Sequence, residues 1–285
     1  MSAGVGYALL SLACAGVLDV VFGRYSGKRP VTAVYLIGIG IVVVLGQTAA
    51  FAIARVPFAW DAGAALWGTL AGAVLMWANA LLIESLAGIN VSLGSTIYRL
   101  NTIAVVVFAV AFLDEALTMP KSAGVLLGVL AVALLYHRGG RGGDERLLRL
   151  SVALAIGAAL LRAGFGVLAK VGVSGGADPF LLMIYIGAGW TLAAIVYGML
   201  RGERPTGEPG VLRYALMSGT LVCLVASFLL LGLRTGEASV VIPIANMSFV
   251  VALLISAASG MERLTAQKLL AVASAALAIT LLTRA

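Results

Sequence analysis

The fold is decided around residues 95–102, STIYRLNT, which run on through an apolar segment to LDE at residues 113–115. This segment is long enough to cross a bilayer, because about 20 apolar residues span the hydrocarbon core. Arg99 lies well inside it. A charge at that depth is costly and is tolerated where it faces the interior of a helix bundle or a water-filled cavity. In a membrane protein, Arg99 would therefore be the first candidate for a functional residue.

The composition indicates that the whole chain is a membrane protein. Of its 285 residues, 62% are hydrophobic and 11% are charged, and the mean hydropathy is +1.09. A soluble domain has about 45–50% apolar and about 25% charged residues, so a soluble globular protein is excluded. The net charge of +7 does not point to nucleic acid, because most basic residues lie in short loops between apolar runs. That distribution is the usual topology signal of a membrane protein.

The apolar runs predict ten helices, since lipid offers the backbone no hydrogen-bond partners. The first run begins at about Ala3 with no Lys or Arg before it, which favours a permanent helix over a cleaved signal peptide. We expect the helices at residues 4–23, 31–54, 63–84, 91–112, 120–137, 149–170, 179–200, 212–233, 238–259 and 266–283.

The two halves of the chain resemble each other. A shift of 147 residues places Glu115 on Glu262 and Lys121 on Lys268, within a common pattern Glu-x-Leu-Thr-x-x-Lys. A Gly- and Arg-rich linker at 139–148 would separate a first repeat, 1–138, from a second, 149–285. Each half has five predicted helices, an odd number, so the second is inverted relative to the first. We expect an all-α membrane protein of two inverted five-helix repeats, with a binding site at their interface near the bilayer midplane.

Basic residues also suggest an orientation. Lys and Arg are more frequent in the loops on the side opposite the N-terminus. The positive-inside rule then makes that side cytoplasmic and places both termini outside. The expected location is the inner (cell) membrane, as a multi-pass protein.

Polar side chains gather around Arg99. Ser95, Tyr98 and Thr102 lie at positions i−4, i−1 and i+3 from it, so they share or border its helix face. The functional interpretation is a cavity wall on which Arg99 holds a carboxylate or phosphate. The structural alternative is an arginine that locks two helices through a buried ion pair or backbone carbonyls.

The predicted second repeat should form the opposite wall of the cavity, with different chemistry. The shift of 147 residues aligns Arg99 with Asn246, and the positions aligned with Ser95, Tyr98 and Thr102 are apolar. Pro243 should loosen this helix and free a carbonyl group. A site that is charged and aromatic on one wall, with an amide and apolar groups on the other, suits a substrate with one anionic and one apolar end.

Four further residues are candidates. Asp19 and Arg162 lie inside helices and either pair with each other or each contact the cavity. Glu84 could carry a coupling proton or be an interfacial carboxylate paired with an arginine. Trp77 lies seven residues before Glu84 on the same helix face, and we expect it to contact the apolar part of a substrate.

The sequence has no nucleophile–base pair, phosphate loop or metal-ligand spacing. We therefore expect no enzyme activity, no catalytic residue, no metal and no cofactor. Cys14 and Cys223 are interpreted as packing residues. Glu115 and Glu262 are interpreted as turn and cap residues, and the Gly-x-x-x-Gly patterns at 68–72 and 124–128 as close helix contacts.

The chain resembles the EamA-type members of the drug/metabolite transporter superfamily. The resemblance rests on GINVSLGSTIYRLNT (88–102), LDEALT (113–118), GEASVVIP (236–243) and ERLT (262–265). It covers nearly the whole chain and implies ten helices around a cavity lined by the first, third, fourth, sixth, eighth and ninth. In that family the termini are often cytoplasmic, opposite to the orientation from the charges.

We therefore expect a secondary transporter that moves a small metabolite with an anionic group, such as an amino acid or organic acid, by alternating access. The partners would be the substrate, the bilayer and protons, with Glu84 or Asp19 as carrier, in a monomer or a dimer. Two alternatives are a flippase for a lipid-linked phosphate headgroup and a multidrug or cation exporter. The second would need an acidic cavity, which Arg99 and Arg162 oppose.

Overall fold

The computed structural model describes residues 3–26, 33–53, 60–85, 97–99, 101–113, 115–134, 145–203, 209–258 and 265–284. Within these ranges the chain is helical and contains no strand. The helices are α1 (Ala3–Ser26), α2 (Ala33–Ile53), α3 (Ala62–Ser85), α5 (Asn101–Leu113), α6 (Met119–Leu134), α7 (Glu145–Ser174), α8 (Pro179–Arg201), α9 (Pro209–Thr235), α10 (Ala238–Asn246), α11 (Phe249–Ala258) and α12 (Ala266–Leu282). Residues 97–99, just before α5, are also helical.

Seven helical segments are long and apolar enough to cross a membrane, and three shorter apolar helices accompany them. Large apolar side chains cover the outside of the bundle. Leu45, Leu126 and Leu192 each expose more than half of their surface, at 64%, 69% and 59%. An exposed apolar surface of this extent marks a membrane interface. The chain therefore has the architecture expected of a multi-pass helical membrane protein.

Polar residues set several helix ends. Asp178 precedes α8, and its Oδ1 accepts the backbone N–H groups of Phe180 at 2.9 Å and Leu181 at 3.3 Å. Gly202 ends the same helix with φ 63°, a left-handed conformation that favours glycine. Asp61 caps α3 in the same way as Asp178 caps α8. Both helices therefore lie within two residues of the predicted ranges 63–84 and 179–200.

Two predicted helices differ from the structure. The predicted helix 238–259 is divided into α10 and α11 by a turn at Met247–Ser248, downstream of Pro243. The predicted helix 149–170 extends at both ends, because α7 begins at Glu145, which pairs with Arg149 one turn later at 2.7 Å. Residues 145–148 of the predicted linker are therefore helical, and residues 139–144 lie outside the described residues.

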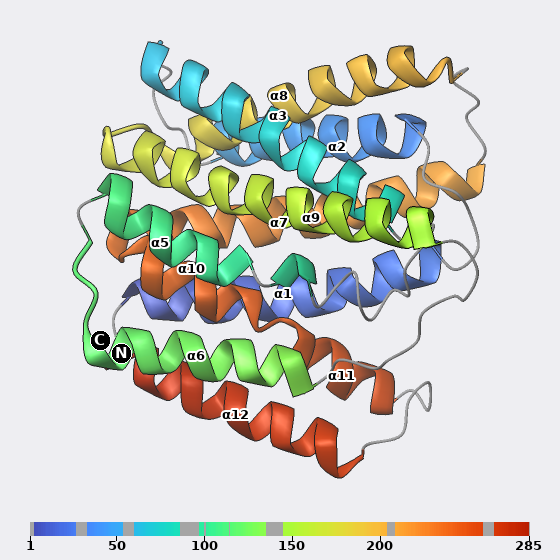
Figure 1. Ribbon diagram of the computed structural model, residues 1–285. Coiled ribbons are helices and arrows are strands. Elements are labelled where there is room, and N and C mark those ends of the chain that lie inside the picture. The colour runs from blue at the N-terminus through green and yellow to red at the C-terminus, as the bar shows by residue number, and fades with distance from the viewer. Residues whose placement is uncertain are drawn as a thin grey trace.

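The helices run roughly along one direction, and α1 begins at the end of the bundle where α12 finishes (Figure 1). α2, α3 and α8 form one edge, and α6 and α12 form the opposite edge. Between these edges, α3 packs on α7 and α8, while α9 packs on α1 and α2. α5 packs on α7 and α10, and α1 also packs on α10. Segments from the two halves of the sequence therefore alternate throughout the bundle.

Glycine allows the closest helix crossings. A Cβ atom on Gly72 of α3 would lie 2.0 Å from the carbonyl oxygen of Ile186 in α8. One on Gly124 of α6 would lie 2.7 Å from Cγ of Leu282 in α12. The close contacts predicted from the Gly-x-x-x-Gly patterns are therefore confirmed at these two crossings.

A charged network surrounds the turn between α9 and α10. The carboxylate of Glu115 is buried and accepts the backbone N–H groups of Ala238 at 2.7 Å and Ser239 at 2.9 Å. The Lys121 ammonium pairs with Glu237, and the Lys170 ammonium donates to the carbonyl oxygens that end α9. Glu115 is thus a cap, as predicted, and the helix it caps belongs to the other half of the chain.

Candidate functional site

A cavity of about 140 Å³ lies inside the bundle. It is walled by α1, α3, α7, α8, α9, α10, Ser248 and the three residues Tyr98, Arg99 and Asn101, so both halves of the chain contribute to it. Three charged side chains reach it, namely Asp19, Arg99 and Arg162. Hydroxyl and amide groups come from Ser11, Asn79, Tyr98, Asn101, Asn246 and Ser248. The apolar wall includes Phe22, Leu75, Phe165, Trp190, Leu229 and Ile242.

The guanidinium group of Arg99 is held by three partners. Its NH2 nitrogen forms a salt bridge with Asp19 of α1. Its NH1 nitrogen donates to the backbone carbonyl oxygen of Asn246 and to the Ser248 hydroxyl, both at 2.8 Å. The guanidinium also lies 5.7 Å from the centre of the Phe249 ring. Arg99 therefore joins α1 to the turn between α10 and α11, where the unwound backbone leaves a carbonyl free to accept.

Arg162 differs from Arg99 in having no anionic partner in the part of the chain that the structure describes. Among the described residues it forms no salt bridge, and its guanidinium lies 5.4 Å from the centre of the Phe165 ring. Arg162 comes from the middle of α7, inside a segment that can cross the membrane. A guanidinium is always protonated in proteins. This part of the cavity therefore presents a fixed positive charge.

Asn246 joins the two halves of the chain at the cavity wall. Its side-chain amide donates to Oδ1 of Asn101 at 2.8 Å and to the hydroxyl of Thr102 at 3.1 Å. Its carbonyl oxygen accepts from Arg99. Asn246 is therefore bonded through both its side chain and its backbone, which makes this wall rigid.

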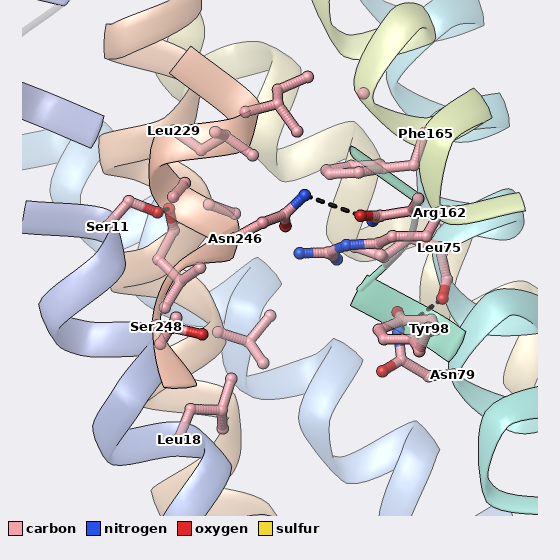
Figure 2. Close-up of a pocket in the computed structure, with 18 of the residues that line it drawn as sticks. Ser11, Leu18, Leu75, Asn79, Tyr98, Arg162, Phe165, Leu229, Asn246 and Ser248 are labelled. Atoms are coloured by element: carbon pink, nitrogen blue, oxygen red, sulfur yellow. Dashed lines mark hydrogen bonds between the residues drawn. The ribbon is translucent and has the colours of Figure 1, made fainter. Parts of the chain in front are cut away.

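Figure 2 shows how the walls face each other. Tyr98, Arg162 and Phe165 lie on one side of the cavity, and Ser11, Asn246 and Ser248 lie on the other. The hydroxyl of Tyr98 is buried and has no hydrogen-bond partner in the described part of the chain, although Arg162 lies close to it. A buried polar group without a partner is unfavourable.

The structure brings most of the predicted residues together. Tyr98, Arg99, Arg162, Asn246 and Asp19 all line the cavity. Thr102 is 6% exposed and lies behind Asn246, to which its hydroxyl is bonded. Ser95 lies outside the described residues.

Trp77 and Glu84 are not brought to the cavity. Trp77 contacts the Tyr197 ring of α8, with centroids 6.0 Å apart, and Glu84 pairs with Arg201 at 2.5 Å. The cavity face of α3 carries Leu75, Asn79 and Leu82. Trp77 and Glu84 each lie two positions from a residue of that face, and residues two apart on a helix point in different directions. Both are therefore turned toward α8, where Glu84 is an interfacial carboxylate paired with an arginine.

Several polar or aromatic lining residues were not predicted as site residues, and they are Ser11, Phe22, Asn79, Asn101, Phe165, Trp190 and Ser248. Asn79 is an isolated amide in an apolar helix, a signal that could have identified it. Ser248 lies in the turn that follows α10, and there its hydroxyl donates to Asp19 at 3.0 Å. Trp190 and Ser11 bond to backbone carbonyls of other helices, contacts that depend on the packing.

The charges define what the cavity can hold. The described residues that line it include two arginines and one aspartate, which together carry one net positive charge. In the described part of the chain, no group of His, Cys, Asp or Glu could hold a metal ion. The arrangement fits a small molecule whose anionic group meets a guanidinium and whose body lies on apolar side chains.

Comparison with known proteins identifies the fold. No protein-family model matches this sequence, and no curated protein matches it. Among solved structures, 29 chains are similar. One, described only as "Crystal structure of protein", aligns with 99% of this chain and 96% of its own length, with a TM-score of 0.77 and 15% sequence identity. At that identity the likeness concerns the fold alone, and it extends over the whole chain.

Proposed function

We propose that the chain is a secondary transporter for a small organic anion that binds in the cavity through Arg162. The observation that carries the proposal is an arginine inside a membrane-crossing helix, facing a cavity, with no salt bridge among the described residues. A charge in such a place is expensive and marks a substrate pathway by default. A substrate carboxylate would supply the missing partner.

The arrangement of helices supports two inverted five-helix repeats. If the halves are exchanged, α1 corresponds to α7, α2 to α8, α3 to α9, α5 to α10 with α11, and α6 to α12. The contact of α3 with α7 then becomes that of α9 with α1, and the contact of α5 with α7 becomes that of α10 with α1. Ten apolar segments, seven long and three short, fit ten membrane crossings. Transport would occur by rocking of the two repeats around the cavity.

Family membership is part of the same proposal. The resemblance to EamA-type transporters of the drug/metabolite superfamily predicts this helix number, this repeat and a cavity between the halves. The cavity here receives residues from α1, α3, α7, α9 and α10 and from the segment that contains Tyr98, Arg99 and Asn101, as the resemblance predicts, together with Trp190 of α8. The protein would act in the cell membrane.

The cavity chemistry favours one class of substrate. Among the described lining residues the one carboxylate is Asp19, and it is already paired with Arg99, so none of them offers a free acidic group to a cation. Phe22, Phe165 and Leu229 provide room for an apolar body. We therefore favour a carboxylate with an apolar body over a quaternary amine or a multidrug cation.

A ligand-stabilisation screen of the purified full chain in detergent tests this function. Monocarboxylates, amino acids, phosphate esters and quaternary amines are compared by the shift in unfolding temperature, since a ligand that binds only the folded state stabilises it. We expect carboxylates to raise the unfolding temperature and Arg162→Gln to remove that shift. Arg149→Gln, which changes an exposed arginine paired with Glu145, is the matched control and should keep the shift. Equal stabilisation of the Arg162→Gln variant, or stabilisation by quaternary amines alone, would contradict the proposal.

A further inference from the structure

We infer that Asp19 is a built-in carboxylate that occupies Arg99 until a proton or a second substrate carboxylate displaces it. The cavity would then present one available arginine when Asp19 is ionised and two when it is protonated. This inference rests on the proposed function, because it takes the cavity to be an anion site. It adds a rule for substrate choice, in which monoanions bind through Arg162 and dianions bind together with a proton.

The hydrogen bonds of Arg99 indicate that its side chain would keep its position if Asp19 were displaced. Only its NH2 nitrogen contacts Asp19, while NH1 is held by the Asn246 carbonyl and the Ser248 hydroxyl. The Asn246 carbonyl is a backbone group and would stay in place if Asp19 moved away, whereas the Ser248 hydroxyl would lose its hydrogen bond to Asp19. NH1 of Arg99 therefore stays anchored to the Asn246 carbonyl, and its NH2 nitrogen would be ready for another carboxylate.

Asp19 is the more accessible member of the pair. Its side chain is 33% exposed, compared with 17% for Arg99. The bonds it makes in the described part of the chain, from Arg99 and from the Ser248 hydroxyl, end on Oδ2. A carboxylate bound through one oxygen at the edge of a cavity can rotate away more easily than one enclosed on all sides.

The groups around Asp19 allow the direction of the pH effect to be derived. Arg99 and Tyr98 face it from the segment at 97–99, Ser248 from the turn after α10, and Arg162 reaches the same cavity from α7. α9 contributes only apolar side chains to this lining, and the other charged residue of α1 is Arg24. Protonation of Asp19 removes the one negative charge, so the cavity becomes more positive as pH falls. Dianion binding and protonation of Asp19 therefore favour each other, and this coupling is reciprocal.

Matched acids on the purified full chain provide the test. Butyrate and hexanoate are the monocarboxylate probes, and succinate and adipate are the dicarboxylates of equal carbon number. Affinities are measured by calorimetry at about pH 6.5 and about pH 8, where the probes are almost fully ionised, in buffers of different ionisation enthalpy, so that protons taken up by the protein are counted directly. We expect the dicarboxylates to bind about tenfold more tightly at the lower pH, within the usual range of coupling between two sites. They should take up a proton, whereas the monocarboxylates should not.

Asp19→Asn should bind the dicarboxylates tightly at both pH values, without proton uptake. Glu145→Gln, which changes an exposed glutamate paired with Arg149, should behave as the wild type. The number of protons taken up on dicarboxylate binding is measured on the wild-type protein. This measurement therefore tests the inference even if Asp19→Asn does not fold. Dicarboxylate binding without proton uptake, or an Asp19→Asn variant that keeps the pH dependence, would overturn the inference. Failure of every acid to bind through Arg162 would instead overturn the proposed function.

Discussion

At the scale of single residues, Arg99 and Arg162 reach one cavity with different surroundings. Arg99 has a carboxylate, a hydroxyl and a backbone carbonyl as partners, whereas Arg162 has an aromatic ring. Burial of an arginine without an anion is expensive, and the pair with Asp19 offsets part of that cost for Arg99. For the anion binding that we propose, Arg162 is therefore the first candidate to interact with the ligand.

Tyr98→Phe is expected to leave the protein as stable as the wild type or to stabilise it slightly. The buried hydroxyl has no hydrogen-bond partner among the described residues, and such a group costs about 1–3 kcal/mol. Thermal unfolding in detergent measures the effect, with the same variant tested for butyrate binding. A loss of stability larger than about 1 kcal/mol would show that the hydroxyl is bonded in the folded protein.

Residue roles were predictable only in part from the sequence. An arginine in an apolar run indicates a cavity or an ion pair, and the predicted correspondence of Arg99 with Asn246 agrees with the hydrogen bond from Arg99 to the Asn246 carbonyl oxygen. Trp77 was assigned to the substrate, but it faces Tyr197 because rotation of α3 directs Leu75 and Asn79 inward instead. In an apolar helix surrounded by other apolar helices, periodicity does not distinguish the face toward a cavity from the face toward a neighbour.

At the scale of elements, the cap on α10 comes from a different half of the chain. The Glu115 carboxylate accepts two backbone N–H groups at the start of α10, where the helix dipole favours a negative charge. We expect Glu115→Ala to destabilise the folded state by about 2 kcal/mol, because two buried N–H groups lose their acceptor. Thermal unfolding in detergent measures this loss.

Glu145→Ala provides the comparison for the Glu115 prediction. Glu145 also begins a helix, but it is exposed and pairs with Arg149 one turn later. Exposed pairs contribute about 0.5 kcal/mol or less. Equal unfolding temperatures for the two variants would contradict the capping role of Glu115.

The crossing of α3 and α8 should not tolerate a larger residue. A Cβ atom on Gly72 would lie 2.0 Å from a backbone oxygen, so Gly72→Ala must separate the helices. We expect a loss of about 2 kcal/mol, typical of overpacking. Gly164→Ala is the matched control, because the nearest side-chain atom would be 3.9 Å from its Cβ. A stable Gly72→Ala variant would mean that this helix pair is looser than described.

Element positions were more predictable than residue roles. Apolar runs bounded by Asp, Pro, Gly and Arg identified α3 and α8 to within two residues. The break after α10 occurs at Met247–Ser248, several residues beyond Pro243, and no residue type marks it. Its cause is tertiary, since Gly16 brings α1 against this turn and Arg99 takes the carbonyl of Asn246.

At the scale of the molecule, contacts between the two halves lie at different depths. The network of Glu115, Lys121, Lys170 and Glu237 joins them at one end of the bundle. Arg99 and Asn246 join them beside the cavity. Leu82, near the C-terminal end of α3, also lines the cavity. In the alternating access that we propose, the cavity would open at one end of the bundle while it closed at the other.

Thiol accessibility tests this alternation directly. In a variant with Cys14 and Cys223 changed to alanine, Asn79→Cys places one thiol in the cavity wall. We expect a membrane-impermeant thiol reagent to reach it from one side of the membrane without substrate. Saturating butyrate should slow labelling from that side and increase it from the other, because a transported ligand changes the populations of the two states. Met76→Cys, which is fully buried on the same helix, should remain unlabelled. Equal labelling from both sides under all conditions would indicate an open channel instead of alternating access.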